Sequence, residues 1–134
     1  MSREEINPGW DFSRYTFAPA VRHGDTVYVS GLDALGDDGV MRCPGDMAGQ
    51  LRVIYGKLAA VLAAAGGTLD DVVMTREYVI TFDDYRSTAQ VRRDVFRQPF
   101  PAAVGVRVSG LVHQGALIEL EAVAELGGVP GGDA

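Results

Sequence analysis

The chain has 134 residues, of which 47% are hydrophobic and 22% are charged, with a formal net charge of −6. This length suits one domain with a substantial core, and the composition is that of an ordinary soluble globular protein. The acidic balance argues against a nucleic-acid partner, because binding phosphates requires a basic face. The longest apolar run, residues 58–65, is far shorter than the roughly 20 residues of a membrane span, so no membrane partner is expected.

The start of the chain and its single cysteine predict a cytoplasmic protein. The polar start, MSREEINPGW, lacks the apolar segment of a secretory signal. A single cysteine, Cys43, excludes an internal disulfide framework and fits a reducing compartment. We therefore expect a single domain over residues 1–134, with a loose arm at 1–12 and a flexible tail at 127–134.

The first predicted elements are a strand and a long helix. TVYVS (26–30) follows the turn residues His23-Gly24-Asp25 and predicts a strand. A loop that can hold a short strand then leads to Asp46, which is placed to cap a helix. Apolar residues from Met47 to Ala65 recur at spacings of four and three, and Gly66-Gly67 ends the helix.

The second half of the chain predicts three strands and one more helix. VVMTREYVIT (72–81) is rich in β-branched residues, and a helix opens at Asp83 or Asp84 and stops before Pro99 and Pro101. PFPAAVGVRVSG (99–110) and ALIELEAVAEL (116–126) predict the last two strands. The order ββαβαββ indicates an α+β fold in which two helices cover one face of a four- to six-stranded sheet.

The second face of this sheet is neither clearly polar nor clearly apolar. In the last strand it holds Leu117, Glu119, Glu121 and Val123. In the strand before, valines alternate with three other residues that we assign to the same second face, namely Ala103, Gly105 and Arg107. Such a mixture predicts that another copy of the chain covers part of this face, and the alternative is a partly apolar face open to water.

Glu119 and Glu121 are the strongest candidates for chemistry. They lie two residues apart in a strand, so they point to the same face among apolar neighbours. Burial by a partner would raise a carboxyl pKa there and suit it to acid–base work. The alternative is an ion pair with Arg107 or Arg76. The two histidines, His23 and His113, lie in turns without metal-ligand spacing, so neither a metal nor a cofactor is expected.

Several segments together resemble the RidA family, also called YjgF, over about residues 17–126. They are AVRHGDTVYVSG, Gln50 at the first helix, VLAAAGGTLDDVVMTREYV, PFPAAVGVRVSGL and ALIELEAVAEL, in that order. The resemblance implies a chorismate-mutase-like fold assembled as a homotrimer, with a barrel-like centre and ligand clefts between subunits. It also implies hydrolysis of reactive enamines and imines to ketoacids and ammonia, without metal or organic cofactor.

The resemblance fails at the position that binds the substrate carboxylate. The family's PAR motif supplies an arginine that holds a carboxylate bidentately, but here the motif is PAA and Ala103 takes that position. Gly105 is the next inward residue, and Phe17 and Ala89 replace a usual tyrosine and asparagine. Glu119 matches the family's water-handling glutamate, and Ser30-Gly31 matches its SG pair.

No other arginine clearly replaces the missing one. Arg107 lies roughly 13 Å along the strand from Ala103, too far to reach the same point. Arg92 on the second helix, and Arg76 or Glu77 on the middle strand, are further candidates for the cleft, and strand alternation does not decide between the last two.

The sequence therefore supports a divergent RidA-like hydrolase or deaminase that acts on an imine, an enamine or a related small metabolite, as a pathway tailoring enzyme. Glu119 is its predicted catalytic residue. The predicted substrate-binding residues are Phe17, Ser30, Gly31, Glu77, Arg92, Ala103, Gly105 and Arg107. The small residues Ala103 and Gly105 would enlarge the cleft and make it less selective for anions. The alternative is a trimer that binds a small molecule without turning it over, and the net charge disfavours a ribonuclease.

Overall fold

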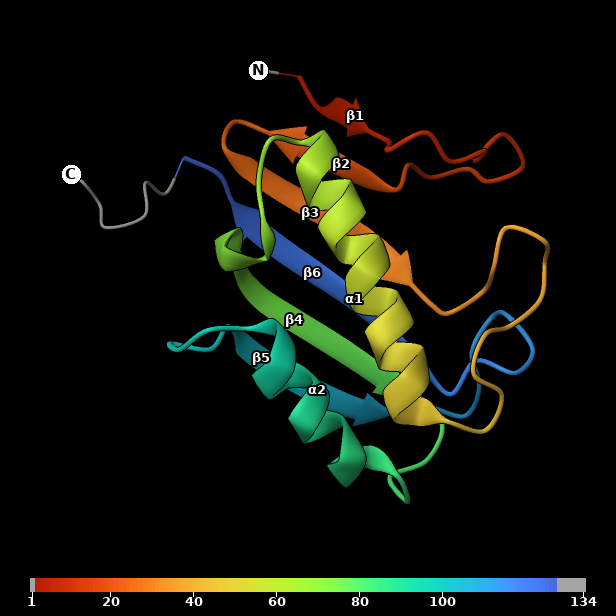
Figure 1. Ribbon diagram of the computed structural model, residues 1–134. Helices are drawn as coiled ribbons and strands as arrows, with labels where there is room; N and C mark the ends of the chain where they lie inside the picture. The colour runs from red at the N-terminus through yellow and green to blue at the C-terminus, as the bar shows by residue number, and fades with distance from the viewer. Residues whose placement is uncertain (1, 128–134) are drawn as a thin grey trace.

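The computed structural model describes residues 2–127 as one sheet with two helices on the same side (Figure 1). The strands are β1 (Glu4–Ile6), β2 (Ala20–His23), β3 (Thr26–Leu32), β4 (Val72–Val79), β5 (Ala102–Arg107) and β6 (Ile118–Glu125). The helices are α1 (Met47–Ala64) and α2 (Thr88–Val95), and the short 3-10 turns η1 (Leu69–Asp71) and η2 (Tyr85–Ser87) precede β4 and α2. The sheet order is β1-β2-β3-β6-β4-β5. All neighbours are antiparallel except β4 and β5.

The predicted α+β class, with two helices on one face of the sheet, is confirmed, but the strands before α1 differ from the prediction. Glu4–Ile6 pairs with Ala20–Arg22 at the sheet edge, within the segment that we expected to be a loose arm. The loop before α1 holds only an isolated bridge between Leu35 and Met41. A three-residue strand is too short to show a period of two, so its sequence gave no signal.

The helix α1 forms as its sequence predicts. The Asp46 side chain accepts a hydrogen bond from the Gly49 amide at 2.9 Å and caps the N-terminus. Gly66 has a positive φ of 87°, and the Gly67 amide donates to the Leu62 carbonyl, which closes a Schellman motif. The buried stripe of α1 includes Leu51, Leu58 and Val61 and packs on β3 and β6 to form the core.

The second helix begins later than predicted. Residues 85–87 form the turn η2, and neither Asp84 nor Ser87 caps a helix through its side chain. The hydroxyl of Thr88 instead donates to the Tyr85 carbonyl at 2.5 Å. Val91 is buried against the core, and Arg92 next to it also turns toward the sheet.

The two faces of the sheet are assigned correctly in β6 but not in β5. Ile118, Leu120 and Ala122 are buried under the helices, so Glu119 and Glu121 lie on the open face. In β5, the parallel register sets Gly105 beside the buried Glu77. Ala103, Gly105 and Arg107 therefore share the helix-side face, and Val104 and Val106 lie on the open face with Glu119, the reverse of our prediction.

The physical reason is that β5 is an edge strand. All six of its residues are exposed in the single chain, so neither alternating set marks the core. In addition, β4 lies between β6 and β5, which separates Glu119 from β5 by about 10 Å. The small residues of β5 and the carboxylate of Glu119 therefore do not meet within one subunit.

Candidate functional site

A hollow on the open face contains Glu119. It has a volume of about 360 Å³ and is lined by Gly31, Tyr78, Val108, Gly110, Leu111, Glu119 and Glu121. The register between β4 and β6 sets Tyr78 opposite Glu119 and Arg76 opposite Glu121. Residues of β3, of β4 and of the turn after β5 thus surround the two carboxylates of β6.

Glu119 is held against the backbone of β3. A Cβ atom at Gly31 would lie 2.2 Å from Oε2 of Glu119, so the absence of a side chain at Gly31 makes room for the carboxylate. Burial, followed by the negative charge of Asp33, raises the pKa of the Glu119 carboxyl. Within residues 2–127 the carboxylate of Glu119 makes no hydrogen bond or ion pair, which leaves it available to water or a ligand.

Unlike Glu119, Glu121 has side-chain partners on the same face of the sheet. The hydroxyl of Tyr78 donates a short hydrogen bond to Oε1 of Glu121, and this bond raises the pKa of Tyr78. Nη1 of Arg76 lies 3.8 Å from Oε2 of the same carboxylate. The ion pair that we considered as an alternative role therefore exists for Glu121, with Arg76 as its partner, and Arg107 takes no part in it.

Ser30 and Phe17 belong to a neighbouring part of the surface. Oγ of Ser30 donates to the carbonyl of Ala18 at 2.6 Å, so the hydroxyl secures the segment that carries Phe17. The ring of Phe17 is 52% exposed and contacts the rings of Phe12 and Tyr15. A second hollow of about 440 Å³ lies here, lined by residues 5, 7, 12, 13 and 15–18. The predicted role of both residues in substrate binding stays a prediction.

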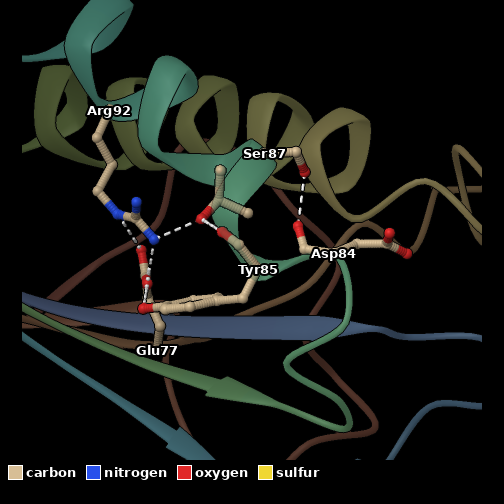
Figure 2. Close-up of polar contacts among 6 residues, drawn as sticks. Glu77, Asp84, Tyr85, Ser87 and Arg92 are labelled. Carbon is tan, nitrogen blue, oxygen red and sulfur yellow. Dashed lines mark hydrogen bonds and ion pairs between the residues drawn. The ribbon is translucent and has the colours of Figure 1, made fainter.

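Glu77 and Arg92 form a compact polar cluster on the helix side of the sheet (Figure 2). Nε and Nη2 of Arg92 donate to the two carboxylate oxygens of Glu77 at 3.0 and 2.7 Å, and Nη2 also donates to Thr88 at 2.7 Å. Glu77 is 1% exposed and also accepts from the Tyr85 hydroxyl at 2.6 Å. The guanidinium lies over the Tyr85 ring at 5.2 Å. Because Nε and Nη2 of Arg92 already donate to the carboxylate of Glu77, Arg92 is not placed to hold a substrate carboxylate bidentately through these atoms.

Tyr85 also explains the small residue at position 105. A Cβ atom at Gly105 would lie 2.2 Å from the Tyr85 hydroxyl. Burial and the hydrogen bond to Glu77 raise the pKa of Tyr85 to about 12, so the hydroxyl remains a donor at neutral pH. The space beside Gly105 is thus filled by Tyr85 in this chain, and it does not enlarge a cleft as we had expected.

The structure therefore divides the predicted site residues into three groups. Gly31 and Glu119 meet in the hollow on the open face, Phe17 and Ser30 lie near the N-terminal segment, and Glu77, Arg92 and Gly105 meet on the helix side. Ala103 and Arg107 lie exposed on the same edge strand as Gly105. Sequence reasoning did not predict that Tyr78 lines the hollow. The available signal was that Tyr78 follows Glu77 in β4, so that the two side chains point to opposite faces of the sheet.

Two common features, a metal cluster and a membrane-spanning helix, are absent from the described part of the chain. Among residues 2–127, no three His, Cys, Asp or Glu side chains stand close enough to hold a metal ion. No helix within the same residues has the length and apolar character needed to cross a membrane.

By its fold, this chain is a small α+β domain in which two helices cover one face of the sheet. The other face carries the half-buried carboxylate of Glu119 in a hollow. The chain belongs to the Endoribonuclease L-PSP family, whose sequence profile matches residues 12–126. It is 34% identical over 110 residues to the 3-aminoacrylate deaminase RutC of Acinetobacter baylyi, covering 82% of this chain and 86% of that one.

Solved structures agree with this assignment. RidA from an Antarctic Psychrobacter species superposes with a TM-score of 0.81 at 26% identity, covering 92% of this chain and 99% of that one. A member of the YjgF/YER057c/UK114 family from Mycobacterium tuberculosis gives a TM-score of 0.79 at 34% identity, covering 93% and 100%. The resemblance to RidA and YjgF is thereby confirmed for the family and the fold.

Proposed function

We propose that this protein hydrolyses an imine, or the imine tautomer of an enamine, to a carbonyl compound and ammonia. The observation that carries the proposal is the half-buried carboxylate of Glu119, which has no hydrogen-bond partner among residues 2–127 and faces a hollow of small-molecule size. The deaminase named among its relatives supports the same class of reaction.

The chemistry needs one group that first accepts a proton and then returns it. Glu119 takes a proton from water as the water oxygen bonds to the imine carbon, and it returns that proton to the imine nitrogen, which gives a neutral carbinolamine. Glu119 then takes the proton of the carbinolamine hydroxyl and gives it to the amino nitrogen as the C–N bond breaks, so that the carbonyl forms and ammonia leaves. Burial raises the pKa of the Glu119 carboxyl, which brings it closer to working pH and suits it to both transfers.

The charges around the hollow indicate which substrates fit. Its lining contains the carboxylates of Glu119 and Glu121 and no arginine or lysine. Position 103, where the family resemblance implies an arginine clamp, is Ala103, and Arg92 is occupied by Glu77. We therefore propose a substrate without a carboxylate next to the reacting carbon. The same negative charges would repel RNA phosphates, which disfavours a ribonuclease.

The open face supports assembly with further copies of the chain. Tyr28, Val104 and Val106 on this face are 52%, 45% and 41% exposed, an unusual amount of bare apolar surface beside a functional hollow. We propose a cytoplasmic homotrimer in which these residues pack against neighbouring subunits. Such packing would enclose the hollow and exclude bulk water from Glu119, as the family resemblance implies.

The experiment compares two kinds of imine generated in place. An amine oxidase supplies imines without a carboxylate, an amino-acid oxidase supplies 2-imino acids, and semicarbazide trapping reports the imine that remains. We expect the protein to accelerate loss of the uncharged imines more than loss of the 2-imino acids. If the protein accelerates the loss of neither kind of imine, yet binds imines or their carbonyl products, the hydrolase hypothesis fails. The alternative of a trimer that binds a small molecule without turning it over would then replace it.

A further inference from the structure

A histidine–aspartate pair lies next to Glu119 and has no part in the function proposed so far. Nδ1 of His113 lies 2.5 Å from Oδ2 of Asp33, although the two residues are 80 positions apart in the chain. The Asp33 side chain is 9% exposed and the His113 side chain 32% exposed. Carboxylates that bond one ring nitrogen fix the orientation and tautomer of an imidazole, as catalytic histidines require.

The backbone segments that carry the two members of the pair are held by side chains of α1. Nζ of Lys57 donates to the carbonyls of Asp33 and Leu35, each at 2.7 Å, and the Leu35 amide donates to Oδ1 of Asp33 at 3.1 Å. The fully buried Gln50 holds the turn after His113, because it donates to the Gly115 carbonyl at 3.0 Å and accepts from the Leu117 amide at 2.8 Å. The core therefore fixes the backbone on both sides of the pair, and the Leu35 amide orients the Asp33 carboxylate.

The same two segments also border the hollow. Asp33 comes two residues after Gly31, against which the Glu119 carboxylate lies, and His113 comes two residues after Leu111, which lines the hollow. Their charges act on Glu119 in opposite directions, since Asp33 raises the pKa of the Glu119 carboxyl and His113 lowers it. The other ionisable groups facing Glu119 are Glu121 on its own strand and Tyr78 on β4, and Arg76 pairs with Glu121.

We propose that Asp33 and His113 form a positioning pair for Glu119. Through their opposite charges at the edge of the hollow, they determine the pH range in which the Glu119 carboxyl keeps its proton. This inference rests on the proposed role of Glu119. Neither residue lines the hollow, and we therefore assign the pair a role through Glu119 and not a direct contact with substrate. Removing either member leaves the other charge uncompensated beside a half-buried carboxyl, so the two removals have opposite effects.

The experiment follows the Glu119 side-chain carboxyl by ¹³C NMR during a pH titration, with its signal assigned by its loss in Glu119→Gln. For His113→Gln we expect the midpoint to rise by about 0.5 to 1 pH unit, because a nearby positive charge is lost. For Asp33→Asn we expect a fall of similar size, and the double variant should lie between the two. His23→Gln and Asp38→Asn are matched controls that should leave the midpoint in place.

The proposal is overturned if both single variants leave the midpoint unchanged or move it in the same direction, which a merely structural role would produce. If Asp33→Asn fails to fold because of its burial, His113→Gln and His113→Asn decide the question alone, since both must raise the midpoint. The titration needs no turnover. A failure of the proposed hydrolysis therefore appears as absent activity with the shifts intact, and a failure of this inference as absent shifts.

Discussion

Gly31→Ala tests whether the position of the Glu119 carboxylate matters. The new Cβ would lie 2.2 Å from Oε2 and 3.0 Å from Cδ of Glu119, whereas ordinary contact begins near 3.4 Å, so the carboxylate must move by at least about 1 Å. A misplacement of this size costs on the order of 10²-fold in rate when a catalytic group must meet its substrate. We therefore expect turnover of the best imine substrate to fall about 100-fold.

Stability should hardly change in the same variant. The clashing atoms are the far end of a flexible side chain, and Gly31 has no positive φ that alanine would strain. We expect the free energy of unfolding, measured by urea denaturation, to change by less than about 1 kcal/mol. Gly56→Ala is the matched control, since a Cβ there meets nothing within 4 Å on the exposed side of α1. Full activity in Gly31→Ala would refute the placement of the reacting carboxylate against Gly31.

Three further predictions concern the rest of the molecule. Arg92→Met should lower the free energy of unfolding by about 3 kcal/mol, because it strands a buried carboxylate, whereas Arg93→Met on the exposed side should have little effect in the same denaturation assay. Ala103→Arg should raise kcat/KM for 2-imino acids about 10- to 100-fold if β5 of one subunit borders the hollow of the next, and an unchanged value would contradict that arrangement. Light scattering at micromolar concentration should give the mass of a trimer, and a clean monomer mass would remove the proposed assembly.

The parts of the fold that the sequence predicted are those with a long one-sided pattern. The stripe of α1 spans five turns and is bracketed by Asp46 and Gly66, and β6 alternates without interruption, so one face of each could only be core. The edge strand β5 alternates equally well, but neither of its faces is buried in the single chain. Its pattern therefore carried no information on which face meets the helices.

The polar clusters could not be predicted from the sequence, for a different reason. Glu77 meets Arg92 from another element 15 residues away, and Asp33 meets His113 across 80 residues. Such pairs depend on sheet order and on the path of the loops, which residue spacing does not encode. The sequence did place Glu119 on the open face, because β6 alternates without interruption. The catalytic role that the family resemblance implies for Glu119 stays a prediction.

The most direct test of the account is turnover by Glu119→Gln, measured as ammonia release from the preferred imine with the trimer verified by light scattering. We expect a fall of about 10² to 10⁴-fold, since the amide cannot accept a proton from water. Glu121→Gln should reduce turnover less, because Glu121 is already engaged by Tyr78 and Arg76. Unchanged turnover in Glu119→Gln would contradict the central claim that this carboxylate moves the proton.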